Sequence, residues 1–187
     1  YRAECEHLLL RQQVDPHFLF NCLTNAAALT EVDPARARTF LGELASVYRY
    51  ILGMSERRSV TLDEEMHFVR AYLRLQQVRF AEGLEVTYDV DPQALAGRVV
   101  PGSVQMLVEN ALKHNTRTAE SPLRIRVATT PGGVEVSNNV QRREPETSTG
   151  NGLRILAELH RRYGLAVRIV PKEEVFSVTI PFLPQGI

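Results

Sequence analysis

The spacing of hydrophobic residues first changes at Gly83, and this change limits the fold more than any other feature. Before it, apolar side chains recur every three or four residues, as on one face of an α-helix. After it, residues 84–90 (LEVTYDV) alternate between apolar and polar, as in a half-buried β-strand. We therefore expect a helical first part, followed by a second part that mixes strands and helices.

Helix-start signals divide the first part. Asp15-Pro16 and Asp33-Pro34 each place a capping residue before a proline, which suits the first helical position because no N–H is needed there. Residues 61–64 (TLDE) match a capping box, in which the threonine and glutamate side chains cap the helix start reciprocally. The predicted helices cover residues 2–13, 16 to about 29, 34 to about 54, and 61–80.

Turn residues and alternation divide the second part. Residues 131–133 (PGG) form a turn cluster between two alternating segments, and residues 141–149 are polar without periodicity, which predicts a loop. The predicted strands are 84–90, 123–130, 134–140, 165–170 and 175–182, and the predicted helices are 102–114 and 151–163.

Composition narrows the classes of function. The 187 residues carry 22 Lys plus Arg and 22 Asp plus Glu, which argues against a protein that mainly neutralises a nucleic-acid backbone. Because the sequence contains no run of about 20 apolar residues, it predicts no membrane span. Cys5 and Cys22 lie in apolar helical patterns and are expected to be buried free thiols. Because the chain begins at Tyr1 without an initiator methionine, we expect a fragment whose upstream part has been removed.

His17 lies near the start of the helix predicted from residue 16. The apolar stripe of this helix consists of Leu19, Cys22, Leu23, Ala26 and Leu29. A helical wheel places His17 and Asn21 opposite that stripe, so the imidazole is expected to point away from the core. A neutral, exposed imidazole is a nucleophile at physiological pH. The spacing alone favours an ordinary surface histidine near a helix start.

A second set of candidate residues lies on the predicted helix 102–114. Glu109, Asn110 and Lys113 share the face opposite its apolar stripe. An amide oxygen suits a hard cation and an ammonium group suits phosphate oxygens, a combination that fits Mg-nucleotide. The same residues also fit a solvated helix face with a Glu109–Lys113 ion pair.

Glycines flank the start of the helix predicted over 151–163. The segment reads Gly150-Asn151-Gly152-Leu153. Glycine permits close approach of the backbone, and a helix N-terminus offers free N–H groups to phosphate. An ordinary turn from a loop into a helix has the same residues.

In combination, these segments resemble the LytS-type sensor histidine kinases across nearly the whole chain. The acceptor motif of that family, NPHFLFN, stands here as DPHFLFN at residues 15–21. The further matches are 62–65 (LDEE), 72–73 (YL) and 79–80 (RF) in the connecting segment, 108–114 (VENALKH) in the N box, and 150–153 (GNGL) in the last glycine box.

The resemblance implies an α+β fold with two modules. Residues 1–60 would form a helical dimerisation and phosphoacceptor region, and residues 61–187 a connecting helix with an α/β-sandwich ATP-binding domain of the Bergerat type. The chain would autophosphorylate His17 from Mg-ATP and pass the phosphoryl group to an aspartate of a response regulator. It would form a homodimer.

The resemblance also implies where the protein acts. A sensor and a membrane segment would lie upstream of this chain, and in the full-length protein the kinase core would lie at the cytoplasmic face of the inner or cell membrane. The fragment itself is expected to be soluble, without direct nucleic-acid binding.

The resemblance assigns roles to single residues. Its nucleotide site would comprise Asn110, Lys113, Asn138, Gly150, Gly152 and Leu153. Asn110 would coordinate Mg²⁺ and Lys113 would meet phosphate oxygens, while Glu109 would orient Asn110 or polarise water at the metal. Asn21, one turn after His17, is our candidate for fixing the imidazole tautomer.

The first glycine box departs from the family pattern. The family usually has Asp-Asn-Gly, whose carboxylate receives the adenine amino group, whereas residues 138–140 read Asn-Asn-Val. The Asn138 amide would accept that hydrogen bond without charge assistance, and Val140 removes backbone freedom. We therefore expect weaker or altered nucleotide binding. Asp15 replaces the usual asparagine and is expected to cap the helix.

Two other functions stay open from the sequence. A nucleotide-binding pseudokinase, acting as an interaction module, would explain the altered glycine box but not the retained His17, Asn110 and Lys113. An ATPase of the broader Bergerat class would use Glu109 to activate water, but it would not need the motif around His17.

Overall fold

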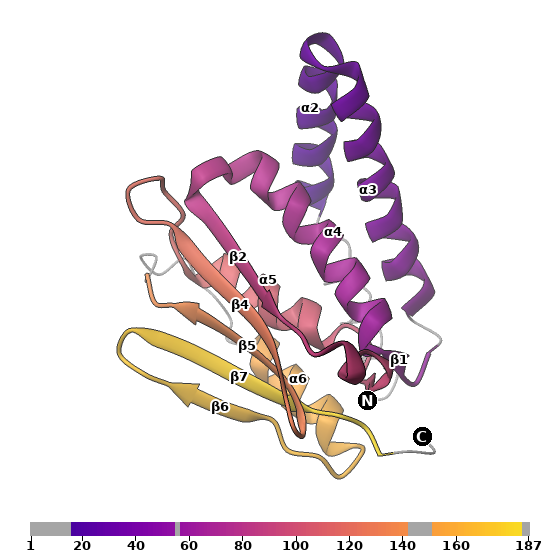
Figure 1. The fold of residues 1–187 in the computed structure, drawn as a ribbon, viewed down its shortest axis with the longest axis vertical. Helices are drawn as coiled ribbons and strands as arrows, with labels where there is room; N and C mark the ends of the chain where they lie inside the picture. Colours follow the sequence, from indigo (N-terminus) through magenta and orange to yellow (C-terminus); the bar gives the residue numbers. More distant parts are fainter. Residues whose placement is uncertain (1–15, 55–56, 142–150, 185–187) are drawn as a thin grey trace.

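The structure, a computed structural model, describes residues 16–54, 57–141 and 151–184 (Figure 1). The predicted helix over 2–13 and the predicted loop beyond residue 141 lie outside these ranges. So do the predictions on Cys5, Asp15 and Gly150. Within the described residues, helices precede a sheet with its own helices, so the expected α+β fold is confirmed.

Two helices, α2 (Pro16–Val32) and α3 (Pro34–Met54), form a hairpin that stands away from the sheet (Figure 1). Both begin at the prolines that the sequence predicts. Asp33 joins them and caps α3, because its Oδ1 accepts the Arg36 N–H at 2.9 Å. None of the helices within the described ranges has both the length and the hydropathy needed to cross a membrane.

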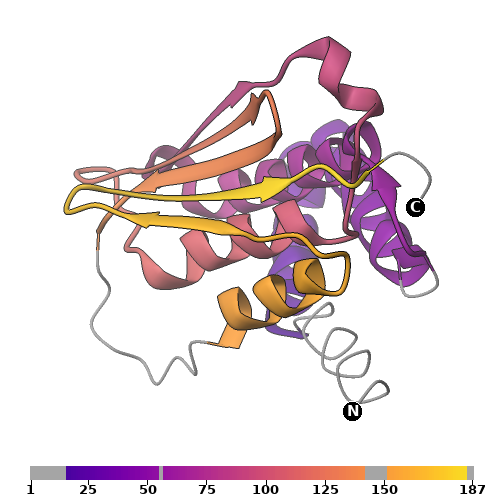
Figure 2. The same cartoon turned by 90° about the horizontal axis from the view of Figure 1, so that it is seen from below.

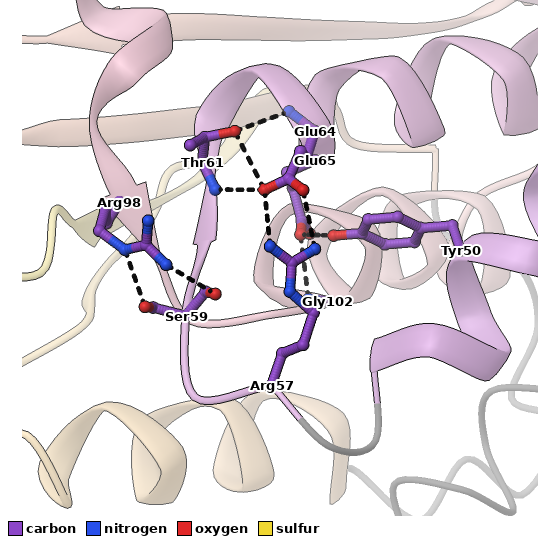
Figure 3. A network of polar contacts seen from close by, with 8 residues as sticks. All are labelled: Tyr50, Arg57, Ser59, Thr61, Glu64, Glu65, Arg98 and Gly102. Carbon is purple, nitrogen blue, oxygen red and sulfur yellow. Dashed lines mark hydrogen bonds and ion pairs between the residues drawn. The ribbon is translucent and has the colours of Figure 1, made fainter.

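The next helix, α4 (Leu62–Phe80), begins at the predicted capping box. The Glu64 N–H donates to Thr61 Oγ1 at 3.2 Å, and the Thr61 N–H donates to the Glu64 carboxylate at 2.9 Å. Arg57 donates to the same carboxylate through two hydrogen bonds of 2.8 and 3.1 Å (Figure 3). The first turn of α4 is therefore tied to the chain that follows α3.

A five-stranded sheet forms the second part, in the order β2-β4-β5-β7-β6. The elements are β2 (Leu84–Asp89), α5 (Ser103–His114), β4 (Leu123–Thr130), β5 (Gly133–Asn139), α6 (Asn151–Arg161), β6 (Arg168–Pro171) and β7 (Val175–Pro181). β2 and β4 are parallel, and the other neighbours are antiparallel. A parallel pair needs a crossover connection, and α5 lies within it.

Helices cover one face of this sheet. Figure 2 shows α5 and α6 below the strands. Val136 and its alternate neighbours are buried on that face. The other face carries ion pairs between neighbouring strands, Arg124 with Glu85 and Arg126 with Asp89. This alternation is typical of a sheet with one solvated face.

The structure adds elements that the spacing did not predict. They are the paired strands β1 (Val60–Thr61) and β3 (Arg98–Val99), and the 3₁₀ helices η1 (Ala81–Gly83) and η2 (Pro92–Ala96). Each is too short to show a period. The strand predicted from residue 165 begins only at Arg168, because the Leu165 N–H bonds back to the His160 carbonyl around Gly164, whose φ is +71°.

One hydrophobic core joins the helices to the sheet. It runs from Phe18 of α2 through Leu73 of α4 and Val108 of α5 to Val178 of β7. Cys22 belongs to it, and burial raises the pKa of its thiol to about 11, so the predicted buried thiol is confirmed. The division into residues 1–60 and 61–187 stays a prediction.

The contact between Arg57 and Glu64 makes stability depend on acid pH. Hydrogen bonds from Arg57 lower the pKa of Glu64 from 4.5 to about 2, so its contribution is complete above pH 4.5 and is lost towards pH 2. Since the side chains are 43% and 39% exposed, we expect about 1 kcal/mol or less. Glu64→Gln should therefore flatten the pH profile of the unfolding free energy in this range, measured by urea denaturation.

Glu85→Gln is the control, because Glu85 also pairs with an arginine but on the exposed sheet face. It should keep the slope of the wild type. A wild-type slope in Glu64→Gln would contradict the prediction.

Candidate active site

His17 lies on the first turn of α2 and is exposed, as its position on the helical wheel predicts. Asn21 lies one turn later, and its Nδ2 is 3.2 Å from His17 Nδ1 and 3.5 Å from Nε2. An amide N–H donates only to an unprotonated ring nitrogen. The shorter contact, to Nδ1, therefore favours the tautomer that carries its proton on Nε2.

The buried face of α2 is rotated from the predicted stripe. Phe18, Cys22 and Ala26 are buried, whereas Leu23 is 45% exposed, so the prediction that Leu23 lies in the stripe is wrong. The Phe18 ring packs against Tyr72 of α4 with a centroid distance of 5.0 Å. An aromatic ring buries more area than a leucine and therefore sets the inward direction of the helix.

α5 has the two faces that the sequence predicts. The apolar stripe is buried and consists of Val104, Leu107, Val108, Ala111 and Leu112. On the other face, Glu109 and Asn110 are half-buried and Lys113 is exposed. Gln105 Nε2 donates to Glu109 Oε1 at 2.8 Å. The Glu109 carboxylate is thus held by its own helix, one turn earlier.

His114 and Asn115 end α5. Burial, with the charge of Lys113, lowers the pKa of His114, so its imidazole is neutral at pH 7. Asn115 is buried, donates to the Ala111 carbonyl at 2.8 Å and accepts the Gln141 N–H at 2.7 Å. It therefore fixes the end of α5 to the chain just after β5.

Asn138 lies near the end of β5, on the face that the helices cover. It is buried, and its Nδ2 donates to the Asn139 carbonyl at 2.7 Å. Val140 follows where the family has glycine, and its N–H donates to the Glu174 carbonyl at 2.9 Å. Since Val140 has no positive φ, the backbone here accepts a side chain without strain.

Gly152 and Leu153 lie in the first turn of α6. Leu153 is partly buried against the core. Around Gly152, no atom of the described residues lies within 4 Å of the position that a Cβ would take, and its φ is not left-handed. Neither packing nor conformation within the described chain therefore requires a glycine at this position.

The elements that carry these residues are neighbours. α5 packs against β4, β5 and β7 on one side and against α6 on the other (Figure 2). Asn110, Lys113, Asn138 and Gly152 thus lie on adjoining elements. His17 is separate from them, because α2 packs against α3 and α4.

The donors present suit a magnesium ion only together with a ligand. Among the described residues, no three His, Cys, Asp or Glu side chains gather as a metal site. Asn110 offers one amide oxygen, a donor that Mg²⁺ accepts, and Mg²⁺ commonly takes further ligands from substrate phosphates and water. A surface hollow lies between residues 89–94 and 129–131, and none of the candidate residues lines it. It adjoins the start of β5, whereas Asn138 lies near the other end of that strand.

Comparison with known proteins identifies the family. The family described as Histidine kinase matches residues 5–84. Sensor protein LytS of Streptococcus agalactiae serotype V is 34% identical over 137 residues, 71% of this chain and 23% of that protein. Sensor histidine kinase/phosphatase LytS of Staphylococcus aureus (strain Mu50) is 39% identical over 105 residues, 56% of this chain and 18% of that protein. The chain belongs to the LytS-type histidine kinases.

This LytS-type chain corresponds to part of its relatives only, since it spans 18% and 23% of the two LytS proteins named above. Two solved structures are similar to it. The catalytic domain of histidine kinase ThkA has a TM-score of 0.48 at 18% identity and covers 68% of this chain and 97% of its own. A bacterial phosphotransferase has a TM-score of 0.49 at 15% identity and covers 92% of this chain and 95% of its own.

Sequence reasoning gave no role to two polar residues that the structure makes prominent, Glu65 and Asn115. Glu65 falls within the buried stripe of α4, between Leu62 and Val69. A carboxylate in such a stripe is a usable signal, because it can be buried only with hydrogen-bond donors around it. Asn115 directly follows α5, where a side chain can satisfy one of the last helical carbonyls.

Asn110 and Asn115 allow folding to be separated from function. Asn115→Ala removes two hydrogen bonds from a buried position and should lower the unfolding free energy by about 1–3 kcal/mol. Asn110→Ala alters the half-buried polar face and should stay within about 0.5 kcal/mol of the wild type. Chemical denaturation measures both. A large loss in Asn110→Ala would show that this residue serves the fold.

Proposed function

We propose that this chain is a kinase core that transfers the γ-phosphoryl group of ATP to His17 and then to an aspartate of a response regulator. The observation that carries the proposal is the exposed imidazole within the DPHFLFN motif, at residues 15–21. A pure ATPase or a binding module has no need of a solvent-accessible histidine in this setting.

The proposed nucleotide site lies along the polar face of α5. Lys113 would meet phosphate oxygens, and Asn138 would accept the adenine amino group on its amide oxygen. Gly150, Gly152 and Leu153 would let the start of α6 approach the triphosphate, which is supported by the lack of any contact among the described residues that requires glycine at position 152.

Asn110 would hold Mg²⁺ together with the phosphates, and the ion would neutralise charge on them. Glu109 would orient Asn110. Its own position is supported by the hydrogen bond from Gln105.

The transfer itself requires little beyond positioning. The unprotonated ring nitrogen of His17 would attack the γ-phosphorus, and the bond from that phosphorus to the bridging oxygen would break to release ADP. Asn21 would orient the ring through its hydrogen bond before the attack, because a lone pair that accepts the Asn21 N–H is not free to attack phosphorus. In the second step, the phosphorus–nitrogen bond would break as an aspartate oxygen of the regulator attacks.

We infer that the complete protein is a membrane-associated sensor. The relatives that are named LytS sensors are several times longer than this chain, so a sensing segment and a membrane anchor would lie outside it. The kinase core would then act at the cytoplasmic face.

Labelling with γ-³²P-ATP tests the kinase activity. The wild type should acquire an acid-labile phosphate, and His17→Ala should lose it. His67→Ala is the matched control, because His67 is also exposed on a helix but lies outside the motif. Asn21→Ala should slow labelling about tenfold or more through loss of ring orientation.

Other outcomes point to the other functions. Release of phosphate without labelled protein would indicate an ATPase that relies on Glu109. Nucleotide binding without either product would indicate a pseudokinase. Label that persists in His17→Ala would refute His17 as the acceptor.

We also propose a homodimer formed through the hairpin of α2 and α3. These helices expose large apolar side chains, namely Phe20, Leu23, Val32, Leu41 and Leu52. Leu41, Ala45, Tyr48 and Leu52 follow one another at spacings of four, three and four, so they form one stripe along α3. Two such hairpins would form a four-helix bundle around this stripe.

Sedimentation velocity at micromolar concentration should find a dimer of the wild type. Leu41→Lys combined with Leu52→Lys should weaken association about a hundredfold or more, because two charges would enter an apolar interface. Ile169→Lys is the control, since Ile169 is as exposed as Leu41 but lies on β6. A monomeric wild type would contradict the proposed dimer.

A further inference from the structure

A fully buried carboxylate, that of Glu65 on α4, lies where three helices meet. Its Oε2 accepts the Tyr50 hydroxyl at 2.5 Å and the Gly102 N–H at 3.0 Å. Its Oε1 accepts the N–H groups of Val104 at 3.0 Å and Gln105 at 3.3 Å. Figure 3 shows the Tyr50 ring reaching from α3 towards this carboxylate. Four donors therefore compensate the loss of water around it.

The carboxylate acts as the cap of α5. Gly102, the residue before α5, is left-handed with a φ of 76° and offers no side-chain cap. The first N–H groups of the helix are instead satisfied by a residue nearly forty positions earlier in the chain. A negative charge at this end also interacts favourably with the helix dipole. The position of α5 is thus bound to that of Glu65.

Tyr50 extends this connection to the hairpin. Its ring stacks on that of Phe68, with 4.8 Å between the ring centroids. The Phe68 centroid lies 5.9 Å from that of Tyr72, which in turn lies 5.0 Å from that of Phe18. Phe18 is the residue next to His17. The Tyr50 ring therefore contacts the row of aromatic rings that leads to the first turn of α2, where His17 lies. The Tyr50 hydroxyl contacts Glu65, the cap of α5.

We propose that Tyr50 and Glu65 are positioning residues that fix α5, with Asn110 and Lys113, relative to the hairpin that carries His17. This role rests on the proposed kinase function. α5 is a continuous helix, so a shift of its first turn moves the residues two turns later. A movement of α3 that withdraws the Tyr50 hydroxyl would remove one of four donors from a buried carboxylate, and the first turn of α5 would have to adjust.

Tyr50→Phe tests this role, because it removes the hydroxyl and keeps the ring that stacks on Phe68. Tyr88→Phe is the matched control, a tyrosine on β2 outside this network. Hydrogen–deuterium exchange of the full chain is read in peptides over residues 100–108. Tyr50→Phe should raise exchange there about fivefold or more, by loosening the cap, and leave β4 and β5 unchanged. Tyr88→Phe should have no such effect.

Kinetics of His17 labelling supply the second readout. Tyr50→Phe should lower kcat about tenfold and change the KM for ATP less, because phosphoryl transfer needs α5 aligned with the hairpin that carries His17, whereas nucleotide binding does not involve the hairpin. Glu65→Gln keeps the size of the side chain but places an amide N–H among groups that are themselves donors. It should therefore lower kcat more than Tyr50→Phe does.

The outcomes separate the two proposals. Unchanged exchange at the start of α5 in Tyr50→Phe and in Glu65→Gln overturns the positioning role, as does exchange that rises over the whole chain. If the wild type labels normally and Tyr50→Phe has an unaltered kcat, the positioning role is overturned as well. A wild type without label refutes the kinase function, while the exchange measurement still decides whether Tyr50 and Glu65 position α5.

Discussion

The burial of one carboxylate organises this structure more than any other contact. A charge removed from water is costly unless donors surround it, and Glu65 collects them from α3 and from the start of α5. Burial raises the pKa of this carboxyl group, and the donated hydrogen bonds oppose that rise. These hydrogen bonds therefore favour the arrangement of the three helices in which the donors meet one acceptor.

This arrangement joins the two kinds of structure in the chain. α4 packs against α3 on one side and against α5 on the other, so it belongs to the hairpin and to the sheet layer alike. The hydrophobic core is likewise continuous from Phe18 to Val178. The proposed transfer requires a histidine on one helix to come close to a nucleotide bound along another. A shared core with a polar link between its helices is a physical means of keeping that geometry.

The candidate nucleotide site depends on residues whose roles in folding are small. Gly152 is required by neither contacts nor backbone conformation of the described residues, and Asn110 and Lys113 lie on the outer face of α5. Val140 stands where the family has glycine, yet its backbone is unstrained and is held by Glu174. The altered glycine box thus leaves the fold intact, and in the proposed site it would change only the chemistry of the adenine contact.

The sequence alone determined the longer helices and strands and the facing of α5, because the period of apolar residues and the capping signals are local properties. It also predicted the exposure of His17. Tertiary structure decided the rotation of α2, where Phe18 rather than Leu23 turned inward, since that choice depends on Tyr72 of another helix. It likewise decided which groups surround Glu65. Such contacts join residues far apart in the chain, and their energies exist only after the helices have packed.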